Sequence, residues 1–262
     1  MAKVFDAHIH YFYGNKEDMK TFLSTSPYKD MYFAYHSVNF DYLNVDSYLS
    51  DIFGAFLMPF ILKETDISNT NKTLFEYVRC LSSSIYPVPL IDEVNDCVQY
   101  IEMSVGAKEH FIKHNAFACE RRTDAYKHLN DHEKFLILHC DDNVRNNYVD
   151  YLLQRYDKMK IILAHLGVNR RDNNLTLNTL QKFATNKRVY FDTSTIFDSN
   201  ILTAACSIIP NERILFGSDT PFVLKENPID EAIECIMGLN LTEEEKRNIL
   251  YKNAQTLISN IK

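Results

Sequence analysis

Short apolar runs recur along the chain, and most are separated by segments in which apolar residues have helical spacing. An apolar run of about four to eight residues is typical of a buried strand, and apolar residues three and four positions apart indicate an amphipathic helix. Helical spacing is clearest in Val94–Ile101, Val144–Leu152, Ile201–Ile209 and Ile229–Ile236. The expected strands are Val4-Phe5, Ala55–Ile61, Val88–Ile91, Ala107–Lys113, Phe135–Leu138, Ile161–Ala164, Val189–Phe191 and Ile214–Phe216.

This alternation predicts an α/β protein with a parallel sheet. Eight strand–helix units in 262 residues suit a closed (β/α)8 TIM barrel, regular or distorted, which needs about 250 residues. An open doubly wound sheet would usually carry a Gly-rich phosphate loop, and none of the six glycines forms one. The sequence shows no repeat or linker, so we expect one domain over residues 1–262.

Two segments depart from the plain barrel pattern. Residues 11–53 form a long, aromatic-rich insertion after the first strand, and in a barrel such an insertion lies over the face that carries active sites. Its aromatic residues either contribute to a site or simply pack the insertion onto the barrel. At the other end, Thr242 and Glu245 form a capping box before a final amphipathic helix. Asn227-Pro228 has the pattern of an N-cap followed by proline at the first helical position.

Composition limits the partners. The net charge of −7 does not support binding to a nucleic-acid backbone as the main activity. The six cysteines are scattered without a Cys-x-x-Cys pair, which indicates reduced thiols in a cytoplasmic protein. No apolar run approaches the ~20 residues of a membrane helix, and no signal peptide is evident. We therefore expect a cytoplasmic protein that acts on a small molecule and binds neither nucleic acid nor membrane. The sequence leaves open whether it forms a homo-oligomer.

Candidate chemistry lies at the ends of the expected strands. His8 and His10 stand one residue apart on the first strand, so alternation would point both to one face. A His-X-His tripeptide alone is common. However, His139, His165 and Asp219 each end another apolar run. In a parallel barrel the C-terminal ends of all strands meet at one mouth, so these five side chains should converge.

Imidazoles with one carboxylate suit a divalent metal, above all Zn²⁺, with Mn²⁺ or another divalent ion as alternatives. Such a site with an open position activates water for hydrolysis. The alternative for any single histidine is a structural residue at a strand end.

Four motifs resemble the amidohydrolase superfamily of metal-dependent TIM-barrel hydrolases. They are Asp6-Ala7-His8-Ile9-His10, Leu138-His139, Ala164-His165-Leu166-Gly167 and Gly217-Ser218-Asp219-Thr220-Pro221. The branch that they resemble most includes aminocarboxymuconate-semialdehyde decarboxylase. The closing segment from Leu241 to Asn253-Ala254 is similar to the last helix of that branch.

The resemblance implies His8, His10 and Asp219 as metal ligands, with His139 as the usual fourth. It implies that His165 orients or deprotonates water or binds a second metal, and that Asp219 moves a proton to the leaving group. Lys113 lies near the place of a lysine that bridges two metals in some members. It would be that bridge, a contact to the substrate carboxylate or a structural residue, and we favour one metal.

Substrate contacts are expected from the loops around the mouth. Arginine can hold a carboxylate through two hydrogen bonds, although a solvated charge is the ordinary role of a loop arginine. The candidates are Tyr32, His36, Arg121, Arg122, Arg170 and Arg171.

The expected function is hydrolysis of a small amide, lactone or related C–N or C–O bond. The alternative is a metal-dependent non-oxidative decarboxylase (a lyase) or hydratase of a small carboxylic acid, because both reactions use the same ligands. A TatD-like deoxyribonuclease ranks lower, because this chain lacks the Glu-Thr-Asp-Ser-Pro ending of those enzymes. An inactive scaffold barrel ranks lower too, because it would have no need for convergent metal-binding groups.

Overall fold

The computed structural model describes residues 3–11, 45–60, 66–81, 84–92, 97–110, 121–139, 142–167, 173–220 and 228–261. In these residues strands and helices alternate along the chain, as predicted. The strands are β1 Phe5–Tyr11, β2 Gly54–Pro59, β3 Ile85–Pro87, β4 Gly106–His110, β5 Phe135–His139, β6 Lys160–Leu163, β7 Val189–Asp192 and β8 Ile214–Leu215. The helices are α3 Asp46–Asp51, α4 Ile67–Val78, α5 Val98–Glu102, α6 Thr123–Asp131, α7 Asp142–Arg155, α8 Asn173–Phe183, α9 Ser199–Ile208, α10 Pro228–Met237, α11 Glu243–Arg247 and α12 Asn253–Ser259.

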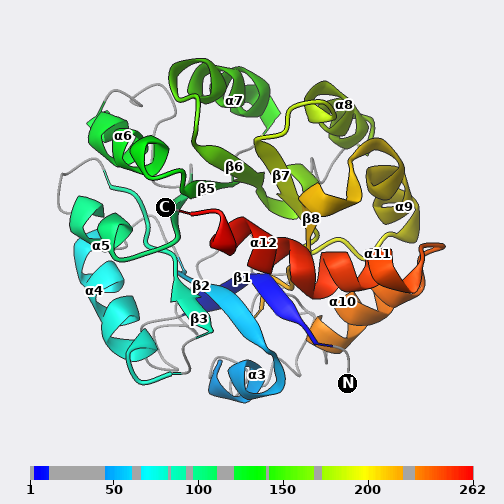
Figure 1. Ribbon diagram of the computed structural model, residues 1–262, viewed down its shortest axis with the longest axis horizontal. Helices are drawn as coiled ribbons and strands as arrows, with labels where there is room; N and C mark the ends of the chain where they lie inside the picture. The colour runs from blue at the N-terminus through cyan, green and yellow to red at the C-terminus, as the bar shows by residue number, and fades with distance from the viewer. Residues whose placement is uncertain are drawn as a thin grey trace, which may run out of the picture.

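All described strand pairs are parallel, and two seams close the sheet into a barrel. The hydrogen-bonded ladders run β1-β2-β3 and β4-β5-β6-β7-β8. Parallel bridges Leu90–Lys108 and Ile9–Thr220 join these two ladders at both edges. Figure 1 shows α3 to α10 arranged in a ring around the strands. The expected (β/α)8 fold is therefore confirmed.

Individual elements differ from the expected positions in detail. β3 begins and ends earlier than the predicted run, and only the bridge at Leu90 falls inside that run. The expected helix over Val94–Ile101 is the short α5 in the described part of the chain. α10 begins at Pro228, as its proline predicts, whereas Asn227 lies outside the described residues. Most of the aromatic-rich segment 11–53 also lies outside them, and α3 comes near its end.

Large side chains fill the barrel interior. Phe56 packs against Phe5 and Phe135, with ring centroids 5.0 and 4.7 Å apart, and all three side chains are buried. Burying an aromatic side chain of this size contributes about 1.5–3 kcal/mol. Outward-facing strand residues, such as Leu136 of β5 and Phe191 of β7, pack against the helices. The barrel interior is thus a packed core, which leaves the rim as the place where a site can form.

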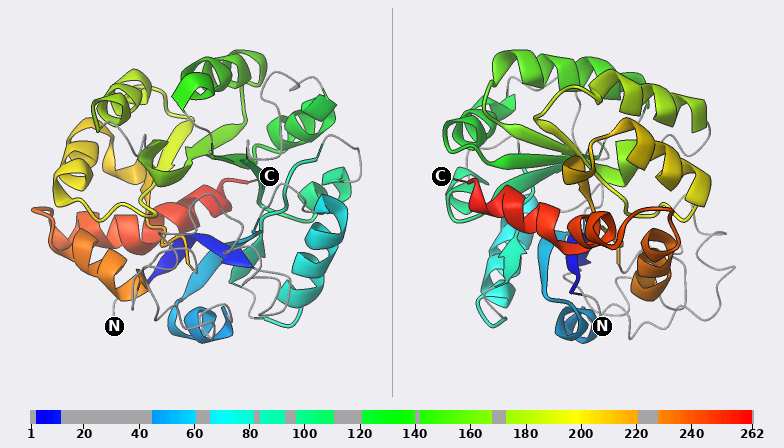
Figure 2. Two further views of the ribbon diagram at one scale, coloured as in Figure 1. Left: turned by 180° about the vertical axis from the view of Figure 1, so that it is seen from behind. Right: turned by 45° about the vertical axis from the view of Figure 1, so that its right-hand side comes forward.

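The C-terminal segment closes the N-terminal end of the barrel. Thr242 and Glu245 form the expected capping box, and α11 continues through a π-helical turn, η6 (Asn248–Lys252), into α12. Leu257 of α12 joins the same buried cluster as Phe5 and Leu215. The Asn253 amide donates to the backbone carbonyl of Ile214, 2.8 Å away. Figures 1 and 2 show α12 lying across this end of the barrel.

No described helix is long and apolar enough to span a lipid bilayer.

Candidate metal centre

The strand ends bring His8 and His10 into the barrel mouth through an irregularity in β1. The register between β1 and β2 shifts between Asp6 and Ile9. Ala7 packs in the barrel interior, whereas Ile9 packs on the outer face. A bulge of this kind re-aims side chains beside active sites. Here it turns His8 and His10 inward together, as the sequence predicted, although strict alternation does not extend through the whole strand.

Three ligand atoms meet at this point. His10 Nε2 lies 3.2 Å from His8 Nε2 and 3.1 Å from Asp219 Oδ1, and His8 Nε2 lies 3.4 Å from the same oxygen. Ligand atoms about 2.0–2.2 Å from one ion lie about 3.0–3.5 Å from each other. The spacing therefore fits one divalent ion held by His8, His10 and Asp219.

Each of the two rings has a separate hydrogen-bond partner for Nδ1, which leaves Nε2 available to bind a metal. His8 Nδ1 lies 2.8 Å from Asp192 Oδ2, and His10 Nδ1 lies 3.3 Å from the Pro59 carbonyl oxygen. Both partners are acceptors, so each Nδ1 carries a hydrogen and each Nε2 faces the ligand cluster. Carboxylates and carbonyls commonly orient metal-binding histidines in this way. The residues present therefore fit a metal site.

Burial and charge set the ionisation of the cluster. Burial, followed by the charge of Lys108, lowers the pKa of His8 to about 3, so the ring is neutral at neutral pH. Burial alone would raise the pKa of Asp219, but its interactions with His165 and His10 outweigh burial and lower that pKa. Neutral imidazoles and an ionised carboxylate are the forms that bind metals.

Asp192, which sequence reasoning missed, connects two parts of the centre. Its Oδ2 accepts from His8 Nδ1, and its Oδ1 accepts the backbone N–H of His165 at 2.9 Å and of Ser194 at 3.1 Å. Together with His8 and His165 it also forms a second group that could hold a metal. The available signal was its position directly after the apolar run Val189–Phe191, matching Asp219 after its own run.

His165 lies beside the cluster in an unusual backbone conformation. His165 and Asp219 both have a positive φ, of 56° and 64°. Such a conformation costs about 1–3 kcal/mol in a residue other than glycine and is concentrated at functional sites. His165 Nε2 lies 2.9 Å from His139 Nδ1. The expected fourth ligand His139 therefore contacts His165, and the described three-ligand groups do not include it.

The lysine of the fourth strand is Lys108 rather than Lys113. Lys108 is buried and its ammonium nitrogen lies 3.2 Å from His8 Nε2. His110, two residues on, stacks on His139 with ring centroids 4.1 Å apart. Lys113 falls after the end of β4 and outside the described residues. The sequence signal was the Lys-x-His spacing of Lys108 and His110 on one face of a strand.

The candidate substrate contacts are placed only in part. Tyr32, His36, Arg170 and Arg171 lie outside the described residues, and Arg121 is exposed just before α6. Arg122 was expected to contact substrate at the mouth, but it is buried behind β4. Its Nε lies 2.7 Å from Glu109 Oε1, and its guanidinium also contacts the hydroxyl groups of Tyr126 and Tyr148.

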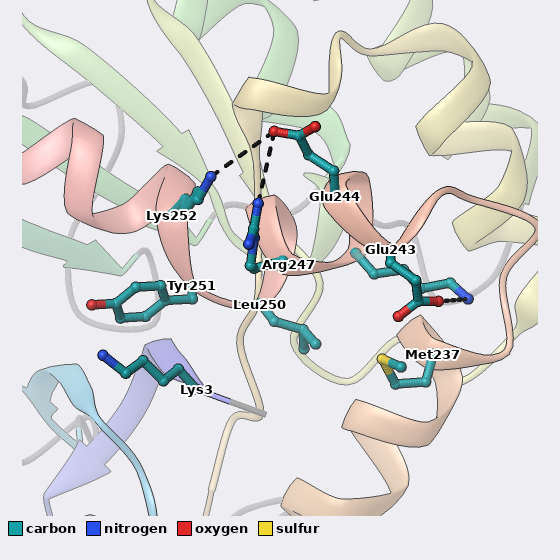
Figure 3. A pocket seen from close by; sticks show the side chains of 9 residues that line it. Lys3, Met237, Glu243, Glu244, Arg247, Leu250, Tyr251 and Lys252 are labelled. Carbon is teal, nitrogen blue, oxygen red and sulfur yellow. Dashed lines mark hydrogen bonds and ion pairs between the residues drawn. The ribbon is translucent and has the colours of Figure 1, made fainter. Parts of the chain in front are cut away.

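A separate surface groove of about 630 Å³ lies at the start of β1, away from the candidate metal ligands. Figure 3 shows Lys3, Tyr251 and the ion-paired side chains of α11 and η6 that line it. Glu244 pairs there with Arg247 at 3.8 Å and with Lys252 at 4.0 Å. The groove contains none of the converging imidazoles and is not the candidate site.

Comparisons with known proteins find similarity in part of the sequence. Residues 144–258 match the amidohydrolase family. A gamma-resorcylate decarboxylase of Polaromonas sp. (strain JS666 / ATCC BAA-500) is 31% identical over 121 residues, which cover 40% of this chain and only 36% of that protein.

Solved structures share the fold over nearly the whole chain. A dihydroxybenzoic acid decarboxylase from Polaromonas sp. JS666, with bound manganese and 2-nitroresorcinol, has a TM-score of 0.68 at 18% identity and covers 99% of this chain and 97% of its own. A 5-carboxyvanillate decarboxylase from Sphingomonas paucimobilis has a TM-score of 0.69 at 11% identity, with both chains fully covered. A 4-oxalomesaconate hydratase from Rhodopseudomonas palustris has a TM-score of 0.66 at 14% identity and covers 98% of this chain and 95% of its own.

Proposed function

We propose that this chain, which resembles the amidohydrolase superfamily in sequence motifs and in fold, is a metal-dependent non-oxidative decarboxylase. Its substrate would be a small hydroxylated aromatic carboxylic acid. The observation that carries the proposal is the convergence of His8, His10 and Asp219 beside the buried ammonium of Lys108. We place catalysis on Asp219 and His165, as the sequence predicts.

The charges of the site favour an anionic substrate. Burial would raise the pKa of Asp192, but its ion pair and hydrogen bond with His8 outweigh burial and lower it, so Asp192 is ionised like Asp219. These two carboxylates balance one divalent cation, and the buried Lys108 ammonium adds a positive charge beside His8. A carboxylate group on the substrate would accept a charge-assisted hydrogen bond from Lys108, which would fix its position.

The two imidazoles and one carboxylate would hold the metal. Zn²⁺ is our first choice because of this N,N,O donor set, with Mn²⁺ as the alternative. When bound, a divalent ion supplies Lewis acidity to a coordinated substrate oxygen.

The protein's own groups would handle the proton. In decarboxylation the bond between the ring carbon and the carboxylate breaks, CO2 leaves, and the carbon gains one proton. Asp219 is ionised and can accept a proton from a substrate hydroxyl group and return it to that carbon. His165 Nε2 lies 2.9 Å from His139 Nδ1, so these two histidines can take up or supply a proton near Asp219.

Hydrolysis, our first expectation from sequence, uses the same ligands. The 31% identical decarboxylase and the positive charge of Lys108 beside His8 both support decarboxylation instead. We further propose one cytoplasmic domain over residues 1–262 that acts on a small molecule and not on nucleic acid or membrane.

The test is a product assay on the purified full chain loaded with Zn²⁺ or Mn²⁺. We expect ¹³CO2 and the ring product from carboxyl-labelled 2,6-dihydroxybenzoate, and no turnover by the His8→Ala/His10→Ala variant. Hydrolysis of an amide or lactone panel without CO2 release from any hydroxybenzoate would refute decarboxylation and support the hydrolase.

A further inference from the structure

Ser194, in the segment after β7, lies between the metal-binding and proton-transfer histidines. Its Oγ is 2.8 Å from His165 Nδ1 and 3.2 Å from His8 Nδ1, and the hydroxyl group also contacts Asp192 Oδ1. The side chain is completely buried. Ser194 thus touches three groups of the centre from a position that no sequence motif singled out.

The direction of the Ser194 hydrogen bond follows from the partners of Asp192. Asp192 Oδ1 already accepts the backbone N–H groups of His165 and Ser194. A third contact to this oxygen must also come from a donor, so the serine O–H points at Asp192.

That direction fixes one nitrogen of the His165 ring. An oxygen whose only hydrogen points at Asp192 can only accept from His165 Nδ1. The Ser194 carbonyl oxygen, 3.2 Å from the same nitrogen, is likewise an acceptor. Nδ1 therefore carries a hydrogen, and Nε2, which faces His139, is the atom that can gain or lose a proton.

We infer that Ser194 is a positioning residue that holds His165 with Nδ1 protonated and so commits Nε2 to proton transfer. Asp192 orients His8 in the same way, because its Oδ2 accepts a hydrogen bond from His8 Nδ1. One carboxylate thereby orients a metal ligand and, through Ser194, the proton-transfer ring. The inference rests on the proposed function only for the step in which His165 moves a proton.

The first test reads the His165 ring directly, without substrate. Protonated and bare ring nitrogens have well separated ¹⁵N shifts, so long-range ¹H–¹⁵N spectra of the Zn²⁺-loaded, histidine-labelled full chain report the state of each nitrogen. A His165→Gln variant assigns the signal. We expect a protonated Nδ1 in the unmodified protein. A bare Nδ1 there overturns the inference, whatever any variant does.

The second test removes the hydroxyl group. We expect Ser194→Ala to increase the share of His165 protonated at Nε2 alone. It should also lower kcat by about 10- to 100-fold, the usual cost of removing an orienting partner, while KM changes less than about threefold. Ser194→Thr keeps the hydroxyl group and should restore both quantities.

Thr195→Ala is the matched control, because its hydroxyl makes only a 3.4 Å contact with His165 Nδ1. It should keep the ring state of the unmodified protein. An unchanged ring state and kcat in Ser194→Ala, or an equal shift in Thr195→Ala, overturns the inference. Circular dichroism checks folding, and if Ser194→Ala does not fold the spectrum of the unmodified protein decides. A protein that lacks decarboxylase activity but shows the expected ring states refutes the proposed function alone.

Discussion

Asp219 combines a position in the proposed metal site, a lowered pKa and a strained backbone in one residue. We expect Asp219→Asn to lower kcat by about 10²- to 10⁴-fold, because an amide can neither accept the mobile proton nor bind the metal as strongly. The fold should persist, since the backbone N–H still donates to the His8 carbonyl at 2.8 Å. Steady-state rates and circular dichroism check both points. Near-normal turnover would remove Asp219 from the mechanism.

Lys108 tests the substrate class. We expect Lys108→Met to raise KM for a hydroxybenzoate by about 10- to 100-fold, because a hydrogen bond to a charged group contributes about 1.5–3 kcal/mol. Lys182→Met is the matched control, because Lys182 pairs with Asp150 on the surface, away from the mouth. Equal KM values for the two variants would contradict a carboxylate contact at Lys108.

The residues that sequence reasoning found are those that end an unambiguous apolar run. His165 and Asp219 were found in this way, and the structure places both at the mouth. Lys108 was missed because the predicted fourth strand extended too far and directed attention to Lys113. Ser194 was missed because its role depends on hydrogen bonds to residues 29 and 186 positions away. No local pattern encodes such contacts.

At the scale of elements, the strand positions followed from apolar runs, but the irregularity of β1 did not. Strict alternation would place Asp6 on the face of His8 and His10. Instead, Asp6 Oδ1 accepts the backbone N–H of His8 at 2.9 Å and of Ser218 at 3.0 Å. The shift depends on pairing with β2 and on the segment after β8, which are remote in sequence. The sequence pattern therefore predicted where the strand lies. It did not predict the register shift, which changes the direction in which its side chains point.

A buried ion pair links the outer face of β4 to the residue just before α6. Glu109 pairs with Arg122, and both side chains are inaccessible to solvent. Arg122→Met would leave the Glu109 carboxylate buried without its partner, so we expect a loss of about 3–5 kcal/mol in the free energy of unfolding. Urea denaturation measures the loss. The double variant with Glu109→Gln should recover part of it, and no recovery would contradict the ion-pair explanation.

The same pair predicts a pH dependence. Burial already raises the pKa of Glu109, against the opposing effect of Arg122. Removing Arg122 should therefore raise the pKa of Glu109 further. An acid with a raised pKa in the folded state destabilises that state as pH rises above the value of the unfolded chain. The deficit of Arg122→Met should therefore be larger at pH 8 than at pH 5.

At the scale of the molecule, the two ends of the barrel separate stability from chemistry. Leu257 is buried at the N-terminal end of the barrel, whereas the candidate metal ligands lie at the other end. We expect Leu257→Ala to cost about 2–5 kcal/mol in the free energy of unfolding while kcat of the folded protein stays unchanged. Leu175→Ala on the exposed face of α8 should cost little. A large fall in kcat for Leu257→Ala would show that the ends are coupled.

Metal removal should lower the stability of the whole fold. A ligand that binds only the folded state at about 100 times its Kd adds about 2.7 kcal/mol to stability. A change of 1 kcal/mol shifts Tm by about 2–4 °C in a chain of this size, so a chelator should lower Tm by roughly 5–10 °C. Differential scanning calorimetry measures the shift. In His10→Ala one ligand is missing, and the chelator should have a much smaller effect. If the chelator shifts both proteins equally, the metal that stabilises the fold is bound somewhere other than between His8, His10 and Asp219.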